Sequence, residues 1–201
     1  MSRLAVLLAG LGLALGLQAS AATAEAPLPQ PFSGRIERLA GFPSKHVSPR
    51  HVDVWLPEGY SPARRYRVVY MQDGQMLFDA RTTWNRQAWK VDQALSRLVQ
   101  AGQVPDALVV GIWNNSPQRY AEYYPEKFLA DAPEAVRREY LEKAAHGRLQ
   151  SDAYLRFLVE ELKPAIDARY ATVAGPEGTF VMGSSMGGLI SLYALCEYPQ
   201  V

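Results

Sequence analysis

The sequence feature that most constrains the fold is a G-x-S-x-G motif at residues 183–187, centred on Ser185. Residues 179–182 precede it as a short apolar strand, and apolar residues recur after it at helical spacing from Leu189 to Leu195. A serine between a strand and a helix lies on a sharp turn, where small neighbours keep the crossing backbones from colliding. Its oxygen is then exposed at the positive N-terminal end of the helix. The motif therefore predicts a nucleophile, and the alternative is a glycine-rich turn with an incidental serine.

The segments before the motif alternate between strand and helix patterns. Residues 66–71 and 107–112 are continuous apolar runs, which are typical of parallel strands covered on both faces. An amphipathic helix is predicted over 91–99, and a longer helix over 151–170 with a kink at Pro164. Strands that alternate with helices form βαβ units. We therefore predict an α/β fold with a mostly parallel sheet.

Two earlier segments predict antiparallel strands that lead into this sheet. Residues 35–39 and 51–56 alternate between apolar and polar side chains, as strands with one wet face do. A charged helix is expected over 131–145, as an insertion over the active-site face. The domain that these elements form is expected to span residues 34–201.

Composition and charge argue against several classes of protein. A chain of 201 residues corresponds to about one domain, and its 48% apolar and 10% aromatic residues supply a packed core. The formal net charge is only +1, from 21 basic and 20 acidic residues, so neither a nucleic-acid surface nor a polybasic membrane patch is indicated. Cys196 is the only cysteine. It is expected to be a buried structural thiol.

The first 24 residues have the pattern of a signal peptide. A short positive start at 1–3 is followed by an apolar run at 4–17 and an Ala-Thr-Ala cleavage site at 22–24. The run is shorter than the ~20 residues that span a bilayer, which disfavours an uncleaved anchor and stable membrane insertion. A proline-rich leader at 25–33 is expected to be extended and mobile. The mature protein is expected to be periplasmic or secreted.

The loop after the strand at 66–71 contains a second candidate feature, Asp73-Gly74-Gln75. Ligands of open α/β sheets bind outside the carboxyl ends of the strands, where this loop and Ser185 would both lie. In α/β-hydrolases one oxyanion donor follows the nucleophile, and another comes from such a loop. The backbone N–H groups of Met186 and Gln75 are therefore the candidate donors. Taken alone, Asp73-Gly74 is better explained as an ordinary turn.

The chain order of the histidines does not match a complete catalytic triad. In α/β-hydrolases the serine is followed by an acid and then by a histidine. His46, His51 and His146 all precede Ser185, and the sequence stops at Val201. We therefore expect the triad acid and histidine to be missing from this chain, either because it is the front part of a longer enzyme or because it is a truncated product.

An ordered set of motifs resembles the family named "Putative esterase". The motifs lie at residues 69–79, 109–114, 119–125, 161–167 and 183–188. This family is related to esterase D, the enterobactin-type esterases, the mycolyltransferases, and the feruloyl and acetylxylan esterases. The resemblance spans residues 34–201 and implies an α/β-hydrolase fold, truncated here after the nucleophile helix, with no metal and no cofactor. It also implies Ser185 as nucleophile, with Gln75 and Met186 as oxyanion donors. Gln72 stands where such proteins often have histidine.

These patterns together predict an exported serine esterase that hydrolyses carboxylic esters through an acyl-enzyme. Trp84, Trp113, Arg119 and Tyr123 are candidate substrate contacts, although packing or surface roles fit each of them equally well. A small-molecule or polysaccharide ester is the expected substrate, and neither nucleic acid nor a metal is expected as a partner. The alternative is an inactive fragment of the fold, or a carbohydrate-binding or interaction protein that kept the turn and lost the triad.

Overall fold

The computed structural model describes residues 26–201. The predicted signal peptide at residues 1–24 lies outside the described residues. Within the described part, no helix is both long enough and apolar enough to span a membrane.

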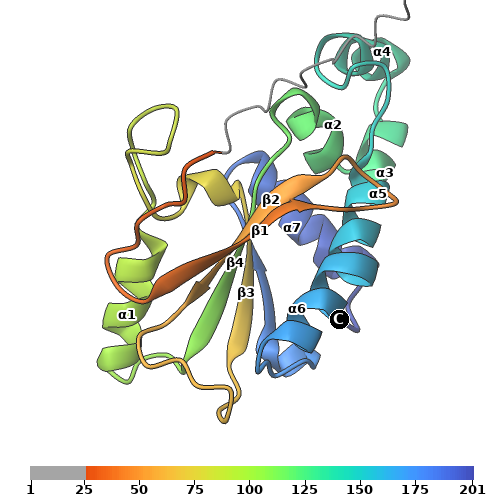
Figure 1. The fold of residues 1–201 in the computed structure, drawn as a ribbon. Coiled ribbons are helices and arrows are strands. Elements are labelled where there is room, and N and C mark those ends of the chain that lie inside the picture. The colour runs from red at the N-terminus through yellow and green to blue at the C-terminus, as the bar shows by residue number, and fades with distance from the viewer. Residues whose placement is uncertain (1–25) are drawn as a thin grey trace, which may run out of the picture.

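A five-stranded mixed sheet, in the order β1-β2-β4-β3-β5, runs through the centre of the molecule (Figure 1). Its strands are β1 (Arg35–Phe42), β2 (Arg50–Leu56), β3 (Arg67–Gln72), β4 (Ala107–Ile112) and β5 (Thr179–Met182). β2 pairs antiparallel with β1 and with β4, whereas β3 pairs parallel with β4 and with β5. The predicted α/β fold with antiparallel leading strands is therefore confirmed.

Helices cover both faces of the sheet (Figure 1). One face is covered by α1 (Val91–Gln100), and the other by α5 (Ser151–Arg156), η3 (Phe157–Leu162), α6 (Lys163–Arg169) and α7 (Met186–Glu197). Neighbouring residues of one strand face opposite sides, so Tyr70 and Val110 belong to the core under α5–α7, while Met71 and Val109 belong to the core under α1. Burial on both faces explains why these strands are continuous apolar runs.

The long helix predicted over 151–170 changes helix type in its middle. The segment 157–162 is a π-helix, and it ends two residues before Pro164. Proline has no N–H to donate to the preceding turn, and its ring clashes with the carbonyl of that turn. A wider π-turn gives the ring room. The disturbance expected at Pro164 thus takes the form of a π-helical segment.

Several short helices complete the chain between the strands. They are η1 (Gly74–Met76), η2 (Ser116–Gln118), α2 (Arg119–Tyr123), α3 (Glu126–Ala130), α4 (Glu134–Lys143) and η4 (Pro176–Gly178). The charged helix expected over 131–145 corresponds to α4, none of whose residues is buried. Figure 1 places α2 near the edge of the sheet where β2 begins and α4 further out.

Residues 26–33 are held against the domain. The Gln30 N–H donates to Asp79 Oδ2 at 3.0 Å, and the Phe32 N–H donates to Asp92 Oδ2 at 2.5 Å. Trp55 Nε1 donates to the Ser33 carbonyl at 2.7 Å. The expected mobile leader is therefore wrong for these residues, because carboxylates and a tryptophan of the domain bond to its backbone.

β5 and α7 together expose an apolar surface. β5 is an edge strand of the described sheet, and its Phe180 and Met182 are 46% and 53% exposed. Leu192 and Leu195 of α7 are exposed as well. Cys196 follows them and is exposed, so the expected burial of this thiol is wrong. The outer side of α7 faces away from the core, although its sequence is as apolar as that of a buried helix.

Candidate active site

Ser185 joins β5 to α7 in a backbone conformation that few serines adopt. Its φ is 56° and its ψ is −122°, in the half of backbone space that residues with a Cβ rarely enter. A Cβ on Gly183 would lie 2.4 Å from the backbone of Gly187, and a Cβ on Gly187 would lie 3.0 Å from Cβ of Gln72. Close packing therefore requires a glycine at 183 and leaves little room for a side chain at 187, and Ser185 itself is exposed.

The turn leaves the Met186 N–H without a partner inside the helix. The Gly187 N–H donates to the Ser184 carbonyl and the Gly188 N–H to the Ser185 carbonyl, both at 2.9 Å. Met186 is the first residue of α7, and the first N–H groups of a helix point outward along its axis. The same helix end favours negative charge. This geometry suits the role of oxyanion donor.

The 3-10 helix η1 forms a second loop at the end of β3. Because β3 and β5 are parallel neighbours, the turns that follow them both lie at the carboxyl ends of these strands, on the same end of the sheet. Asp73 precedes η1 with φ 58° and ψ 46°, and its carbonyl accepts the Met76 N–H at 2.8 Å. Gln75 is the second residue of η1, so its N–H also lacks a partner inside the helix.

The two turns are in close contact. A Cβ placed on Gly187 would lie 3.3 Å from Asp73 Oδ2, which shows how near the η1 loop comes to the start of α7. On its other side the loop rests directly on β4, because a Cβ on Gly74 would lie only 2.3 Å from the backbone of Gly111. Ser185, Met186 and the η1 loop therefore lie together at the carboxyl end of the sheet.

Asp73 is a buried charge at this end of the sheet, and the sequence pattern did not mark its side chain as a site residue. Its Oδ1 accepts Arg119 Nε at 2.8 Å and Asn114 Nδ2 at 2.7 Å, and its Oδ2 accepts Arg119 Nη2 at 2.8 Å. The carboxylate hydrogen-bonds the Arg119 side chain and so raises the pKa of its guanidinium. Arg119, an expected substrate contact, thus donates two hydrogen bonds to the carboxylate of Asp73.

A second ion pair anchors α2 to the start of β2. Arg50 Nη1 and Nη2 donate to the two carboxylate oxygens of Glu122 at 2.8 and 2.6 Å, and both side chains are at most 2% exposed. Tyr123 is fully buried and packs against the ring of Tyr154, with centroids 5.3 Å apart. Burial also raises the pKa of Tyr123. The substrate contact expected at Tyr123 is not possible in this arrangement, because α2 turns the side chain into the core.

A cleft of about 710 Å³ opens beside the η1 loop. Residues that line it include Gln75, Trp84, Trp89, Trp113, Arg119 and Tyr120. Trp113 is held by a 2.9 Å hydrogen bond from its Nε1 to Asp53 Oδ2, whereas Trp84 is 86% exposed. The volume is within the usual range of small-molecule sites. Three predicted contacts, Trp84, Trp113 and Arg119, therefore lie at the cleft, and Trp89 joins them without having been predicted.

Most of the chain matches the model of one known protein family. Residues 45–201 match the model of the family described as "Putative esterase". The chain belongs to this esterase family. The resemblance that the motifs indicated is therefore confirmed.

Three similar proteins illustrate the relationship. YjcH, an uncharacterized protein of Bacillus subtilis strain 168, is 24% identical over 174 residues, which are 85% of this chain and 60% of YjcH. The ferulic acid esterase AmCE1/Fae1A of Anaeromyces mucronatus, solved with ferulic acid, is 22% identical with a TM-score of 0.54, covering 81% of this chain and 53% of that chain. An IroE-like serine hydrolase of Shewanella oneidensis is 26% identical with a TM-score of 0.53, covering 80% and 45%. The chain thus spans about half the length of these proteins.

The titratable side chains of residues 26–201 provide no hydrogen-bonded base for Ser185. His51 Nδ1 accepts a backbone N–H of β1 at 3.2 Å, and His46 Nε2 lies 3.1 Å from Glu160 Oε2. His146 is exposed after the end of α4. The same part of the chain has no group of three His, Cys, Asp or Glu side chains arranged to hold a metal ion.

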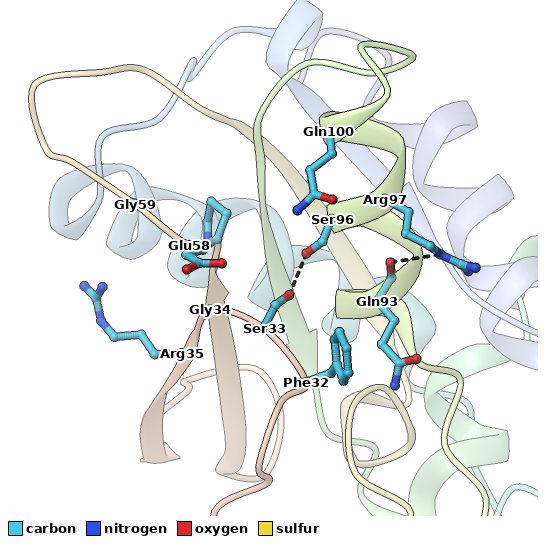
Figure 2. A pocket seen from close by; sticks show the side chains of 11 residues that line it. Phe32, Ser33, Gly34, Arg35, Glu58, Gly59, Gln93, Ser96, Arg97 and Gln100 are labelled. Atoms are coloured by element: carbon cyan, nitrogen blue, oxygen red, sulfur yellow. Dashed lines mark hydrogen bonds between the residues drawn. The ribbon is translucent and has the colours of Figure 1, made fainter.

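A second pocket, of about 530 Å³, is shown in Figure 2 and lies at the opposite end of the sheet from Ser185. It includes residues 57–59, which follow β2, and β2 runs antiparallel to β4 and so ends where β4 begins. Polar groups around it bond to one another: Ser33 Oγ and Ser96 Oγ are 2.6 Å apart, and Arg97 Nε donates to the Gln93 carbonyl at 3.3 Å. This pocket therefore contributes no side chain to the end of the sheet that holds Ser185.

Proposed function

We propose that this chain is the N-terminal portion of an exported serine esterase. The observation that carries the proposal is the exposed Ser185, held at φ 56° between β5 and α7 with the η1 loop packed against the same turn. Membership of the esterase family supports ester hydrolysis in general. The resemblance of the S. oneidensis serine hydrolase supports the serine type. Export to the periplasm or beyond rests on the signal pattern of residues 1–24, and N-terminal sequencing of the mature protein tests it.

In the proposed reaction, Ser185 Oγ forms a bond to the ester carbonyl carbon, and its proton passes to a histidine. The electron pair of the carbonyl moves onto its oxygen, which the N–H groups of Gln75 and Met186 hold. Collapse of this intermediate breaks the ester bond, and the leaving alcohol takes the proton from the histidine. Water then releases the acyl group by the same steps. We propose that this histidine and its acid lie outside the present chain.

The tryptophan-lined cleft supports an ester with a flat apolar group as substrate. Trp84, Trp89 and Trp113 offer ring faces, and planar groups stack favourably on such faces. AmCE1/Fae1A, which shares the fold, was solved with ferulic acid, an acid with an aromatic ring. We therefore propose a small-molecule or polysaccharide ester that carries an aromatic acyl group.

A binding function without catalysis is the second candidate. Two observations favour it: no histidine of residues 26–201 is hydrogen-bonded to Ser185, and Trp84 is 86% exposed, as in a platform for a sugar ring. In that case the chain would bind an ester or oligosaccharide without turnover.

Labelling of the serine separates the two candidates. A fluorophosphonate adds to an activated serine, and intact-mass measurement detects the adduct. The experiment uses the protein encoded by a reading frame that continues past Val201. We expect the fluorophosphonate to label this protein and not to label its Ser185→Ala variant. That substitution is expected to lower turnover of a p-nitrophenyl ester by about a million-fold, with folding nearly unchanged. Equal hydrolysis by both proteins would exclude Ser185 as nucleophile, and absence of both labelling and hydrolysis would favour the binding function.

A further inference from the structure

The η1 loop begins at a residue whose backbone needs support. Asp73 has φ 58° and ψ 46°, a left-handed conformation that aspartate tolerates better than most residues but still adopts rarely. This conformation sets the direction in which the chain leaves β3. It therefore also sets where the next N–H groups point, including that of Gln75.

The side chain of Asp73 supplies this support. Asp73 is 4% exposed, and its carboxylate accepts hydrogen bonds from both Arg119 and Asn114, at 2.7–2.8 Å. An ion pair in which arginine donates two parallel bonds is directional as well as strong. Arg119 is itself fixed, because α2 is anchored by the buried pair of Glu122 with Arg50. The loop is thus connected to β2 through two successive ion pairs.

Asn114 holds the other side of the loop. Its backbone N–H donates to Gln75 Oε1 at 3.2 Å, while its side-chain amide donates to Asp73. Gly74, which lies between Asp73 and Gln75, rests directly on Gly111 of β4. The loop is therefore held at three successive residues by β4 and the chain that follows it.

The charge of Asp73 requires a partner at this place. Its carboxylate lies beside the start of α7, where an oxyanion would form, and an uncompensated negative charge there would oppose that oxyanion. Arg119 compensates this charge without occupying the backbone N–H groups of Gln75 and Met186.

We propose that Asp73 is a positioning residue, which acts through its ion pair with Arg119 to hold the η1 loop so that the Gln75 N–H faces the substrate carbonyl. The proposal rests on the proposed esterase function for its kinetic consequence. It assigns Arg119 to the support of the loop and not to direct binding of substrate.

Kinetics of paired variants test this role. Asp73→Asn keeps the size of the side chain and its tolerance of left-handed backbone but removes the charge, and Arg119→Gln removes the other partner. The matched control is Asp106→Asn, which breaks an exposed arginine–aspartate pair with Arg64, 3.1 Å, far along the chain from the loop. The substrate is p-nitrophenyl acetate, which is small and uncharged.

We expect each variant of the pair to lower kcat by about 100-fold with KM unchanged, since misplacement of a catalytic group by about 1 Å has an effect of that size. The double variant should lose no more than the single ones, because both disrupt the same unit. Arg119→Lys should retain more kcat than Arg119→Gln. Unchanged kcat in Asp73→Asn, or an Arg119→Gln effect confined to KM, would overturn the proposal.

Amide hydrogen exchange tests the same role without ester turnover. The Met76 and Leu77 N–H groups are bonded to the Asp73 and Gly74 carbonyls, at 2.8 and 3.4 Å, so their protection reports on the loop. We expect Asp73→Asn, and not Asp106→Asn, to lose this protection. Unchanged protection overturns the proposal whatever the activity. If Asp73→Asn loses this protection and the wild-type protein hydrolyses no ester, the loop-holding role stands and the esterase function is rejected.

Discussion

At the scale of single residues, two glycines shape the turn around Ser185: position 183 has no space for a side chain, and position 187 has little. The positive φ of Ser185 is strained, and such strain persists only where neighbouring structure enforces it. The enforcing contacts are the approach of Gly183 to Gly187 and of Gly187 to Gln72 on β3. The exposed hydroxyl is therefore a property of the packing around the turn and not of the serine alone.

Gly183→Ala is expected to lower the free energy of unfolding by about 1–3 kcal/mol, because the added Cβ overlaps the Gly187 backbone at 2.4 Å. Gly188→Ala is the matched control, since its Cβ meets only the Gly183 carbonyl oxygen at 3.4 Å. That change in the first turn of α7 should be neutral or stabilising, because alanine favours helix over glycine. Urea denaturation measures both, and equal effects of the two changes would contradict this account.

At the scale of elements, α2 is too short to be stable alone and is held by charges at both ends. It has five residues, with Arg119 bonded to Asp73 at one end and Glu122 bonded to Arg50 near the other. Isolated helices of this length are not stable in water. The ion pairs and the buried Tyr123 therefore fix its place.

Glu122→Gln is expected to lower the free energy of unfolding by about 3–5 kcal/mol, because it leaves the buried Arg50 guanidinium without its counter-charge. Glu139→Gln on α4 is the control, since its pair with Lys143 is exposed and contributes less than about 1 kcal/mol. Urea denaturation again gives the comparison. Similar losses from both changes would show that burial of the pair does not determine its contribution.

The attachment of residues 26–33 is expected to depend on pH through Asp79. Arg81 donates side-chain hydrogen bonds to its carboxylate, and with the Gln30 N–H it holds the pKa of Asp79 well below the ordinary range. In the unfolded chain the pKa of this aspartate is about 3.9, so as the pH falls the unfolded chain binds a proton before the folded one does. The stability from this group is therefore present above about pH 4 and is lost as the pH falls.

Asp79→Asn should accordingly lower the melting temperature at pH 7, with a difference from wild type that narrows below about pH 4. Melting curves of both proteins between neutral and strongly acidic pH measure it. A difference that stays constant across this range would mean that the charge of Asp79 does not stabilise the folded state.

At the scale of the whole molecule, the β5 edge and the outer side of α7 form one exposed apolar surface. An edge strand without charged or proline residues offers free backbone groups to another chain. We expect purified residues 25–201 to self-associate for this reason. We also expect slow labelling with fluorophosphonate, because the structure of residues 26–201 places no hydrogen-bonded base beside Ser185.

Met182→Lys should reduce this association, because it places a charge on the exposed face of β5. Val136→Lys on α4 is the control, since Val136 is equally exposed at 53% but lies on another element. Sedimentation velocity distinguishes monomers from larger species. A monomeric, cooperatively melting wild-type fragment would show that β5 is not an association surface.

Local sequence patterns were enough to predict the elements and the end of the sheet where the candidate site lies. The strands predicted at 107–112 and 179–182 are β4 and β5, and the helix predicted over 91–99 differs from α1 by one residue. Periodicity and turn residues act over a few positions, so a local pattern is enough to place a strand, a turn and a helix. The neighbourhood of Ser185 and the Gln75 loop follows from the rule that parallel strands end at one edge.

Which side chains meet at that end of the sheet became clear only from the folded chain. Asp73 and Arg119 are 46 positions apart, and nothing in the local pattern distinguishes this pair from an ordinary turn and a surface arginine. In the same way, the sequence suggested a substrate contact at Tyr123 and a buried thiol at Cys196, but the packing of α2 buries Tyr123 and that of α7 exposes Cys196. The physical reason is that pairing and burial depend on distances in space, which the order of residues along the chain does not specify.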